Sequence, residues 1–328
     1  MQNAWYIAAT SEELKEGILP RTILSRDILL YRDSKGIAHA LKNQCVHRGA
    51  RLSDGKIHED CIVCPFHGWE FFSDGQCMYI PANGTNASIP TGAKVESYPV
   101  CETAGFVWVY IGKQNHVQEL ALPKEATSPS FRGVPFSAEW NAHVTRVVES
   151  ILDVSHLPFV HPNSTGDVNP IVDGPDFEVT ERHIRIEAQA FHPLLKTPLN
   201  QVEERGSSTI LFSFPNQILL RTNMVKDNGH QMCTYLSFTP VNDETIKIYG
   251  LALRNFLLDV DLIDEIHYEH NVKVLEEDRP IVEGLKPKIS PLDLSKEKHV
   301  RSDGPQVRFR IMFRKALEEE LLEEEFQE

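Results

Sequence analysis

The feature that most constrains this chain is a short segment, residues 45–71, with the sequence CVHRGARLSDGKIHEDCIVCPFHGWEF. Its three cysteines and three histidines lie among glycines and polar residues, a pattern typical of loops. Three chemistries compete for such a segment: a disulfide framework, a zinc site and an electron-carrying metal cluster. Which of them applies determines most of what the chain does.

The rest of the composition narrows this choice. The N-terminus has no basic region followed by an apolar core, which predicts no signal peptide and a cytoplasmic location. In a reducing cytoplasm, six cysteines in 328 residues are expected to be ligands or buried thiols rather than disulfides. No apolar run reaches about 18 residues, so no membrane span is expected. The net charge of −14 argues against a nucleic-acid partner.

The spacing of the candidate ligands favours an iron–sulfur cluster. Cys45 and His47 form a C-x-H arm, and Cys64 and His67 form a C-x-x-H arm after sixteen residues. Two thiolates on one iron and two imidazoles on the other define a Rieske-type [2Fe–2S] centre. Structural zinc also takes two cysteines and two histidines, but it usually pairs like with like. Four further residues are interpreted as non-ligands: His58, Cys61, Cys77 and Cys101.

A second group of candidate ligands lies in VVESILDVSHLPFVHP, residues 147–162. Asp153 and His156 are three residues apart and are predicted to share a helix face. Pro158 disfavours helical geometry at Leu157, so the chain can leave the helix and return His161 toward His156. Two converging imidazoles with a carboxylate suit a non-haem iron. The alternative is a surface aspartate and two ordinary histidines.

The carboxylate is sought in NVKVLEEDRPIVEG, residues 271–284. Asp278 falls on an apolar stripe, whereas Glu276 and Glu277 lie off it. The stripe is formed by Val274, Leu275, Ile281 and Val282. A charge on a core-facing stripe is costly unless it is paired or bound to metal. The alternative to a metal is a salt bridge to Arg279.

Strand and helix patterns predict two domains of an α+β protein, residues 1–115 and 116–328. In the first third, short β-rich runs alternate with turns and predict an antiparallel sandwich that ends near Gly112. Residues 113–137 are interpreted as a connector. Helices are predicted over residues 143–156, 260–283 and 305–326, with six strands between residues 177 and 254.

Two motifs carry a resemblance over nearly the whole chain. CVHRGA…CPFHGWEF resembles the Rieske domain of Rieske non-haem iron oxygenases. D-x-x-H-x-x-x-x-H followed by EEDRPIVE is similar to the catalytic domain of single-subunit members, the vanillate O-demethylase and toluenesulfonate monooxygenase type, and to saxitoxin-pathway hydroxylases. The resemblance implies a Rieske sandwich, a helix-grip catalytic domain and a head-to-tail homotrimer. In such a trimer, the resemblance implies, the two metal sites of one chain would be too far apart for fast electron transfer, whereas sites of neighbouring subunits would be close.

The resemblance also implies roles. His156, His161 and Asp278 would bind the mononuclear Fe(II), and Asp153 would link His156 to His67 of a neighbouring subunit. Electrons would come from NAD(P)H through a separate flavin and iron–sulfur reductase, and O2 would be activated at the iron. The product would be a hydroxylated or oxidatively demethylated small molecule, expected to be aromatic or heterocyclic. Ser150 departs from the asparagine that is common in the family, so its role stays open.

Two other functions compete with an oxygenase. One is a Rieske electron-transfer or ligand-binding protein without mononuclear iron chemistry, and the other is a zinc-stabilised interaction module. The set of Asp153, His156, His161 and Asp278 argues against the first. The walls of a substrate pocket are sought in the strands of the second domain, at Phe212, Phe214, Asn216, Gln217 and Arg221. The alternative is that the aromatics are core, the amides cap turns and the arginine is exposed.

Overall fold

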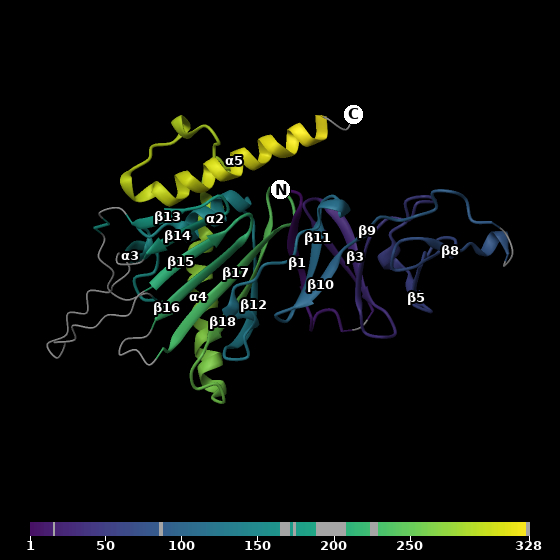
Figure 1. The fold of residues 1–328 in the computed structure, drawn as a ribbon, viewed down its shortest axis with the longest axis horizontal. Coiled ribbons are helices and arrows are strands. Elements are labelled where there is room, and N and C mark those ends of the chain that lie inside the picture. The colour runs from purple at the N-terminus through teal and green to yellow at the C-terminus, as the bar shows by residue number, and fades with distance from the viewer. Residues whose placement is uncertain are drawn as a thin grey trace. The chain divides into compact units, whose positions relative to one another are not determined.

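A computed structural model describes residues 1–15, 17–84, 88–164, 171–172, 175–187, 208–223 and 229–325. The chain divides into two compact units, residues 2–121 and residues 122–328 with Met1 (Figure 1). Both units are built on antiparallel sheets, which confirms the predicted α+β class. The predicted domain boundary between residues 115 and 116 stays a prediction. Within the described ranges, no helix is long and apolar enough to cross a membrane.

The first unit contains three antiparallel sheets, ordered β1-β11-β10, β2-β3-β4-β9 and β5-β6-β7-β8. Every residue of β11 is buried, and its run of aromatic and β-branched side chains explains why it forms a strand. The five runs predicted as strands all occur, as β3, β4, β6, β7 and β11, and six further strands were not predicted: β1, β2, β5, β8, β9 and β10. The elements are β1 (Ala4–Thr10), β2 (Ile18–Ile23), β3 (Arg26–Arg32), β4 (Ala38–Lys42), η1 (Leu52–Asp54), β5 (Lys56–His58), β6 (Cys61–Val63), β7 (Glu70–Phe71), β8 (Cys77–Tyr79), η2 (Pro81–Asn83), β9 (Ser97–Tyr98), β10 (Val100–Thr103), β11 (Phe106–Ile111) and η3 (Gln114–His116).

The second unit is a seven-stranded antiparallel sheet, ordered β12-β18-β17-β16-β15-β14-β13, with helices. All six predicted strands occur, although residues 188–191, Ser207 and Met224, at the ends of three of them, lie outside the described residues. The elements are α1 (Lys124–Thr127), β12 (Arg132–Trp140), α2 (Val144–Leu152), α3 (Leu157–Val160), β13 (Asp176–Val179), β14 (His183–Glu187), β15 (Ser208–Ser213), β16 (Gln217–Asn223), β17 (Gln231–Pro240), β18 (Ile246–Arg254), α4 (Asp261–Gly284), η5 (Leu294–Lys296), η6 (Arg301–Asp303) and α5 (Gly304–Glu325).

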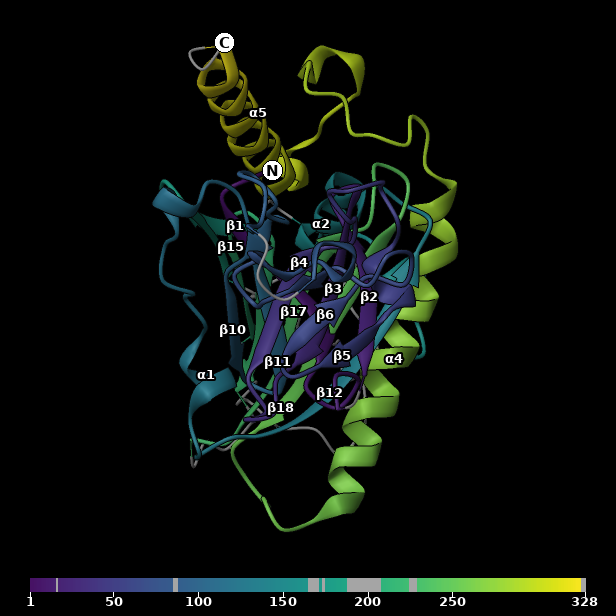
Figure 2. The same ribbon diagram turned by 90° about the vertical axis from the view of Figure 1, so that its right-hand side faces the viewer.

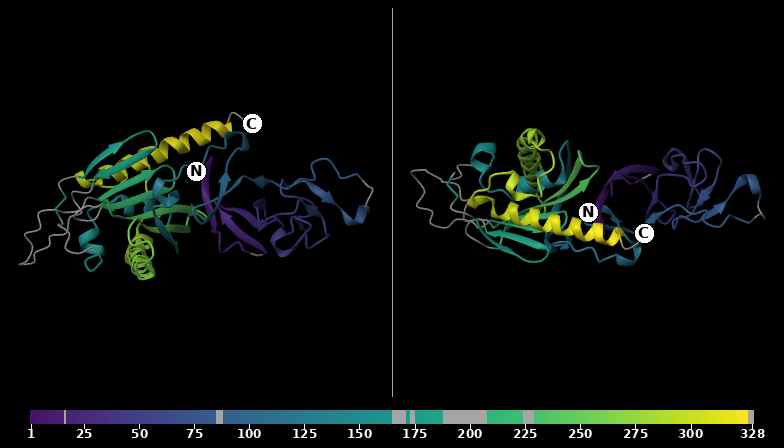
Figure 3. Two further views of the ribbon diagram at one scale, coloured as in Figure 1. Left: turned by 60° about the horizontal axis from the view of Figure 1, so that its bottom comes forward. Right: turned by 90° about the horizontal axis from the view of Figure 1, so that it is seen from above.

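One face of this sheet packs against the helices and forms the core of the second unit. Side chains alternate along each strand, so Phe212 on β15 and Ile218 on β16, which are paired in register, face the same side. They share a core with residues of α2, α4 and α5, including Leu152, Leu275 and Phe309. Figure 2 shows α4 along its length and Figure 3 shows α5 along its length, both beside the sheet. The helices are thereby fixed relative to the sheet.

The predicted connector over residues 113–137 is partly wrong, because residues 132–137 belong to β12. Gly133 and Pro135 obscure the strand in the sequence, since both residues are usually unfavourable in strands. β12 is an edge strand that pairs only with β18. Proline is tolerated there because its missing N–H deprives no second neighbour of a hydrogen bond.

Candidate metal centres

Two loops of the first unit share one backbone arrangement. The Gly49 N–H donates to the Cys45 carbonyl at 2.9 Å, and the Gly68 N–H donates to the Cys64 carbonyl at 3.0 Å. Both glycines have positive φ, +74° and +69°, which favours glycine. In the same way, the N–H of each cysteine donates to the carbonyl five residues later, at 2.8 Å. The two candidate cysteines are therefore held in equivalent turns.

The candidate ligands of these loops lie close together. Cys45 and Cys64 are each 2% exposed, and the rings of His47 and His67 contact each other with centroids 4.7 Å apart. The His47 ring stacks on Trp69 at 4.7 Å. His47 Nδ1 is buried without a hydrogen-bond partner among the described residues. Two buried thiols beside two touching imidazoles are a donor set that fits an iron–sulfur cluster.

Electrostatics agrees with a metal at this position. Burial raises the pKa of the Cys45 thiol to about 11, because a buried thiolate loses its hydration. A coordinating metal reverses this effect and deprotonates the thiol. The residues interpreted as non-ligands lie on strands: His58 on β5, Cys61 on β6, Cys77 on β8 and Cys101 on β10.

In the second unit, three candidate ligands converge. His161 Nε2 lies 3.3 Å from His156 Nε2 and 3.1 Å from Asp278 Oδ1, and His156 Nε2 lies 3.5 Å from the same oxygen. The three ligand atoms lie within 4.8 Å of one another. His161 is 1% and Asp278 is 6% exposed. Two imidazoles and one carboxylate at this spacing could hold an iron ion and leave coordination positions open.

The local backbone differs from the prediction. The helix predicted over residues 143–156 ends at Leu152, so Asp153 and His156 do not share a helix face. Asp153 Oδ1 accepts hydrogen bonds from both the N–H and the hydroxyl of Ser155, each at 2.7 Å. This local turn competes with the helical backbone and ends α2. The contact predicted between Asp153 and His156 nevertheless exists, with Oδ2 3.7 Å from Nδ1.

A second correction concerns Pro158. The chain does not leave helical geometry at Leu157; it begins α3 there, with Pro158 in the first turn. Proline is tolerated at that position because the N–H groups of a first turn have no helical partner. The single turn of α3 returns the chain, and the His161 N–H donates to the Leu157 carbonyl at 3.0 Å. His156 and His161 therefore flank one helical turn.

Asp278 reaches the site from α4, where it lies one turn from the buried Leu275 and Val282. The alternative of a salt bridge to Arg279 does not occur. That guanidinium contacts Glu276 at 3.1 Å and Glu283 at 3.4 Å instead. The predicted stripe is narrower than expected, since Ile281 is 49% exposed.

Sequence reasoning missed Glu277, the residue before Asp278. Glu277 Oε2 accepts a hydrogen bond from His161 Nδ1 at 2.8 Å, and its Oε1 accepts one from the Ser164 hydroxyl at 2.7 Å. The stripe that identified Asp278 says nothing about its neighbours. Burial lowers the pKa of His161, but hydrogen bonds and attraction from Asp278 and Glu277 outweigh burial and raise it overall.

A cavity of about 270 Å³ opens beside Asp153 and His156, between α2, α4 and residues 297–310. Three buried polar atoms of its lining have no hydrogen-bond partner among the described residues: His156 Nδ1, His299 Nε2 and Gln306 Oε1. Gln306 is 8% exposed. Buried polar atoms normally find partners, so this lining is suited to a polar group from outside the unit.

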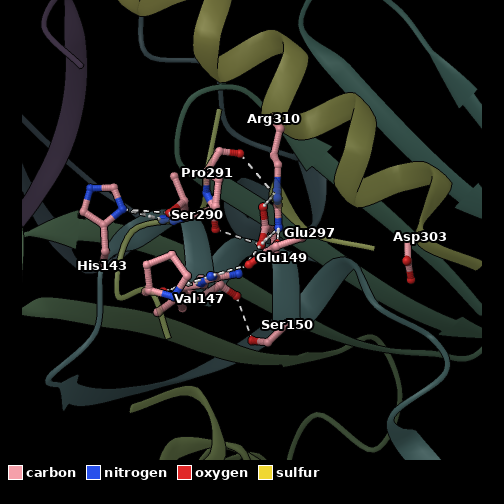
Figure 4. A network of polar contacts seen from close by, with 12 residues as sticks. His143, Val147, Glu149, Ser150, Ser290, Pro291, Glu297, Asp303 and Arg310 are labelled. Carbon is pink, nitrogen blue, oxygen red and sulfur yellow. Dashed lines mark hydrogen bonds and ion pairs between the residues drawn. The ribbon is translucent and has the colours of Figure 1, made fainter. Parts of the chain in front are cut away.

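A buried ion-pair network lies at the wall of this cavity and joins α2 to α5 (Figure 4). Arg310 Nη2 donates to Glu149 Oε2 at 2.9 Å, and the Ser290 hydroxyl donates to the same oxygen at 2.8 Å. Glu297 pairs with Arg310 and accepts a hydrogen bond from Arg146 at 2.7 Å. The network fixes the helix whose end carries Asp153.

The residues predicted for a substrate pocket fall into two groups. Phe212 is fully buried in the core on the helix side, where its ring contacts Phe214 and Phe309. Asn216 is 2% exposed and donates to the Phe238 carbonyl at 3.2 Å. These contacts pack the core and hold the turn between β15 and β16, and none of them tests a role in substrate binding. A pocket role for Phe212, Phe214 and Asn216 stays a prediction.

Gln217 and Arg221 lie on the other face of the sheet, because side chains alternate and these two residues are one and three positions from Ile218. Gln217 accepts a hydrogen bond from the Tyr235 hydroxyl at 2.9 Å. Arg221 Nε donates to Glu125 Oε1 at 3.0 Å, so it is paired rather than simply exposed. The structure does not bring these two residues to the side where the histidines converge.

Paired thiols and imidazoles in one unit, and a two-histidine, one-carboxylate cluster in the other, are the donor sets of electron transfer and O2 activation by non-haem iron. Comparison with known families agrees. Residues 4–99 match the Rieske [2Fe-2S] domain, and residues 140–319 match the vanillate O-demethylase oxygenase C-terminal domain. The chain belongs to the Rieske oxygenases of the vanillate O-demethylase type.

Individual relatives match over most of their length. The chain is 28% identical over 313 residues to the iron–sulfur subunit of the toluene-4-sulfonate monooxygenase system of Comamonas testosteroni, covering 86% of this chain and 87% of that one. It is 28% identical over 308 residues to the oxygenase component of dicamba O-demethylase of Stenotrophomonas maltophilia, covering 87% and 88%. The crystal structure of dicamba monooxygenase bound to dicamba superposes with a TM-score of 0.82 at 25% identity, covering 98% of each chain.

Family membership settles the class of function. The protein is a terminal oxygenase that uses a [2Fe–2S] cluster and non-haem iron, takes electrons from a separate reductase and oxidises a small molecule with O2. The match of the oxygenase domain over residues 140–319 argues against the two alternatives, an electron carrier without mononuclear iron chemistry and a zinc-stabilised module.

Proposed function

We propose that this oxygenase hydroxylates or oxidatively demethylates a small aromatic or heterocyclic molecule in the cytoplasm. The observation that carries the proposal is the convergence of His156, His161 and Asp278 within 4.8 Å. The relatives are named for an arylsulfonate and for dicamba, which supports a ring-bearing substrate. The cysteines of the described residues are all free, as expected of a chain kept in a reducing compartment.

The proposed first domain, residues 1–115, would hold the cluster through Cys45, His47, Cys64 and His67. The matched turns and the unpartnered His47 Nδ1 support this assignment. Each turn holds one cysteine inward, while the adjacent histidine stays nearer the surface. Because His67 is exposed, electrons can enter or leave at that edge.

The second domain, residues 116–328, would hold Fe(II) through His156, His161 and Asp278. When bound, iron supplies the open coordination positions at which O2 is activated. The residues position this centre: α3 spaces the two imidazoles, and α4 anchors the carboxylate through buried neighbours. Burial of His161 and Asp278 limits access of bulk water to this side of the centre.

We further propose a head-to-tail homotrimer in which Asp153 links His156 to His67 of a neighbouring copy. The cavity beside Asp153 supports this, because its unpartnered polar atoms suit a polar group from another chain. Its lining has five carboxylates against three Arg or Lys side chains, whereas Arg48 and Arg51 are exposed on the first ligand loop. Opposite charge of this kind favours association. The net charge of −14 argues against nucleic acid as a partner.

Product analysis tests the proposed reaction. The protein is supplied with NADH and a surrogate flavin and iron–sulfur reductase, then screened against methoxyaryl, sulfonated, N-methyl and heterocyclic compounds by mass spectrometry. A product that gains one oxygen identifies a hydroxylase, and release of formaldehyde identifies a demethylase. A protein whose cluster is reduced but which consumes no O2 with any compound would contradict the proposal.

A further inference from the structure

The environment of His161 contains a carboxylate with no role in the proposed ligand set. Glu277 accepts a hydrogen bond from His161 Nδ1 at 2.8 Å. Its other oxygen accepts a hydrogen bond from the Ser164 hydroxyl at 2.7 Å. Ser164 is itself placed by the local turn, since its N–H donates to the His161 carbonyl at 3.1 Å. The three side chains form a continuous hydrogen-bonded chain, Ser164 to Glu277 to His161.

This chain fixes the tautomer of the imidazole. An ionised carboxylate only accepts hydrogen bonds, so His161 Nδ1 must carry the proton. In the neutral imidazole the lone pair is then on Nε2, which lies 3.3 Å from His156 Nε2 and 3.1 Å from Asp278 Oδ1, where a metal would be shared by the three groups. A metal ligand requires this neutral form, with the opposite nitrogen hydrogen-bonded.

His156 provides the contrast. Its Nδ1 is buried without a hydrogen-bond partner among the described residues, and the Asp153 carboxylate lies 3.7 Å away. Among the described residues of one chain, therefore, a hydrogen bond sets the tautomer and ring orientation of His161 but not those of His156. His161 is prepared for metal before any second copy docks.

We propose that Glu277 is a positioning carboxylate, which holds His161 in its metal-binding tautomer and is itself oriented by Ser164. The inference rests on the proposed iron site. It deepens that proposal by making His161 the pre-oriented imidazole and His156 the one that is completed by docking. Removing the carboxylate leaves the three ligands in place but frees the His161 ring to rotate and change tautomer.

The adjacent Glu276 supplies a matched control. It lies on the same helix turn, but its carboxylate pairs with Arg279 at 3.1 Å and contacts no candidate ligand. Glu276→Gln removes the same charge from α4 at the neighbouring position. A difference between variants at the two positions therefore reports on the hydrogen bond rather than on the net charge of α4.

The experiment measures anaerobic Fe(II) affinity of the full chain and the EPR spectrum of its Fe(II) after nitric oxide is added as a probe. Carboxylates that orient a metal-bound histidine typically contribute about 10- to 100-fold in metal affinity. We expect a loss of this size in Glu277→Ala, a smaller loss in Glu277→Gln, which can still accept a hydrogen bond, and a smaller one again in Ser164→Ala. Glu277→Ala should also broaden the EPR signal, and Glu276→Gln should match wild type.

Near-ultraviolet circular dichroism and thermal unfolding separate these effects from misfolding, and the isosteric Glu277→Gln is available if Glu277→Ala is unstable. Wild-type affinity together with an unchanged EPR signal in a folded Glu277 variant would overturn the inference and leave the proposed function standing. A wild-type chain that binds no iron here would overturn both.

Discussion

The two metal-binding regions are built in different ways. In the first unit, the ligands come from two adjacent loops whose backbone hydrogen bonds are the same, residue for residue. In the second unit, two ligands flank a single helical turn, and the third, Asp278, comes from the distant helix α4. Glu277, the residue before Asp278, is 116 residues from its hydrogen-bond partner His161. The first site is specified by local sequence, whereas the second exists only once α4 has packed against the sheet.

The largest effect should follow from removing one ligand at each site. Cys64→Ala should lose the visible chromophore and all turnover while the second site still binds iron. Asp278→Ala should keep the chromophore but lose the mononuclear iron and turnover. Iron analysis with absorption spectroscopy measures both outcomes. Loss of both metals in either variant would show that the two regions are not independently assembled.

The second site depends on contacts between distant elements, so it should be sensitive to a residue of the ion-pair network that joins α2 to α5. Arg310 is 5% exposed and pairs with Glu149 and Glu297, so Arg310→Ala leaves these two carboxylates with one guanidinium between them, that of Arg146. Breaking a buried pair in this way costs about 3–5 kcal/mol. Chemical denaturation should show this loss in the second unit, with the cluster absorption unchanged. As a control, Arg314→Ala removes a guanidinium whose pair with Glu318 is exposed, and it should have little effect.

The contact between copies gives a third test. Asp153→Asn should keep both metals but lower turnover about 100-fold, the scale expected when a reacting group is slightly misplaced. Single-turnover kinetics, which follow oxidation of the reduced cluster, should show the same slowing. Normal turnover by a fully metallated variant would remove Asp153 from the electron path.

The smallest effect concerns the paired turns. Gly49→Ala and Gly68→Ala each place a Cβ at positive φ, which costs about 1–2 kcal/mol. At Gly68 the added Cβ also lies 3.1 Å from Pro81 Cγ, whereas its nearest neighbour at Gly49 is 3.4 Å away. Thermal unfolding followed at the cluster absorption should therefore rank Gly68→Ala below Gly49→Ala. Equal stability to wild type would show that the turns tolerate other residues.

The sequence predicted what local chemistry determines. The spacing of Cys45, His47, Cys64 and His67 by itself indicates a Rieske-type ligand set. Asp278 could be found because a charge on an apolar stripe needs a partner. The end of α2 was missed because the side chain of Asp153 turns back on Ser155, which helical periodicity does not record.

Other features depend on the fold and could not be read from the chain. Pro135 made β12 hard to predict from the sequence. Proline is tolerated in this strand because β12 lies at the edge of the sheet. Nothing in the sequence distinguished Glu277 from Glu276, since only packing brings the first to His161. The same holds for His299 and Gln306, whose unpartnered atoms matter only because they line the cavity next to Asp153.

The most direct test of the account is the content of iron and acid-labile sulfide per chain. One Rieske cluster and one mononuclear centre predict about three irons and about two sulfides. Asp278→Ala should reduce this to about two irons with the sulfide unchanged. If the wild-type chain, reconstituted under anaerobic conditions with excess Fe(II), holds only about two irons with two sulfides, then His156, His161 and Asp278 do not form an iron site, and the central claim is wrong.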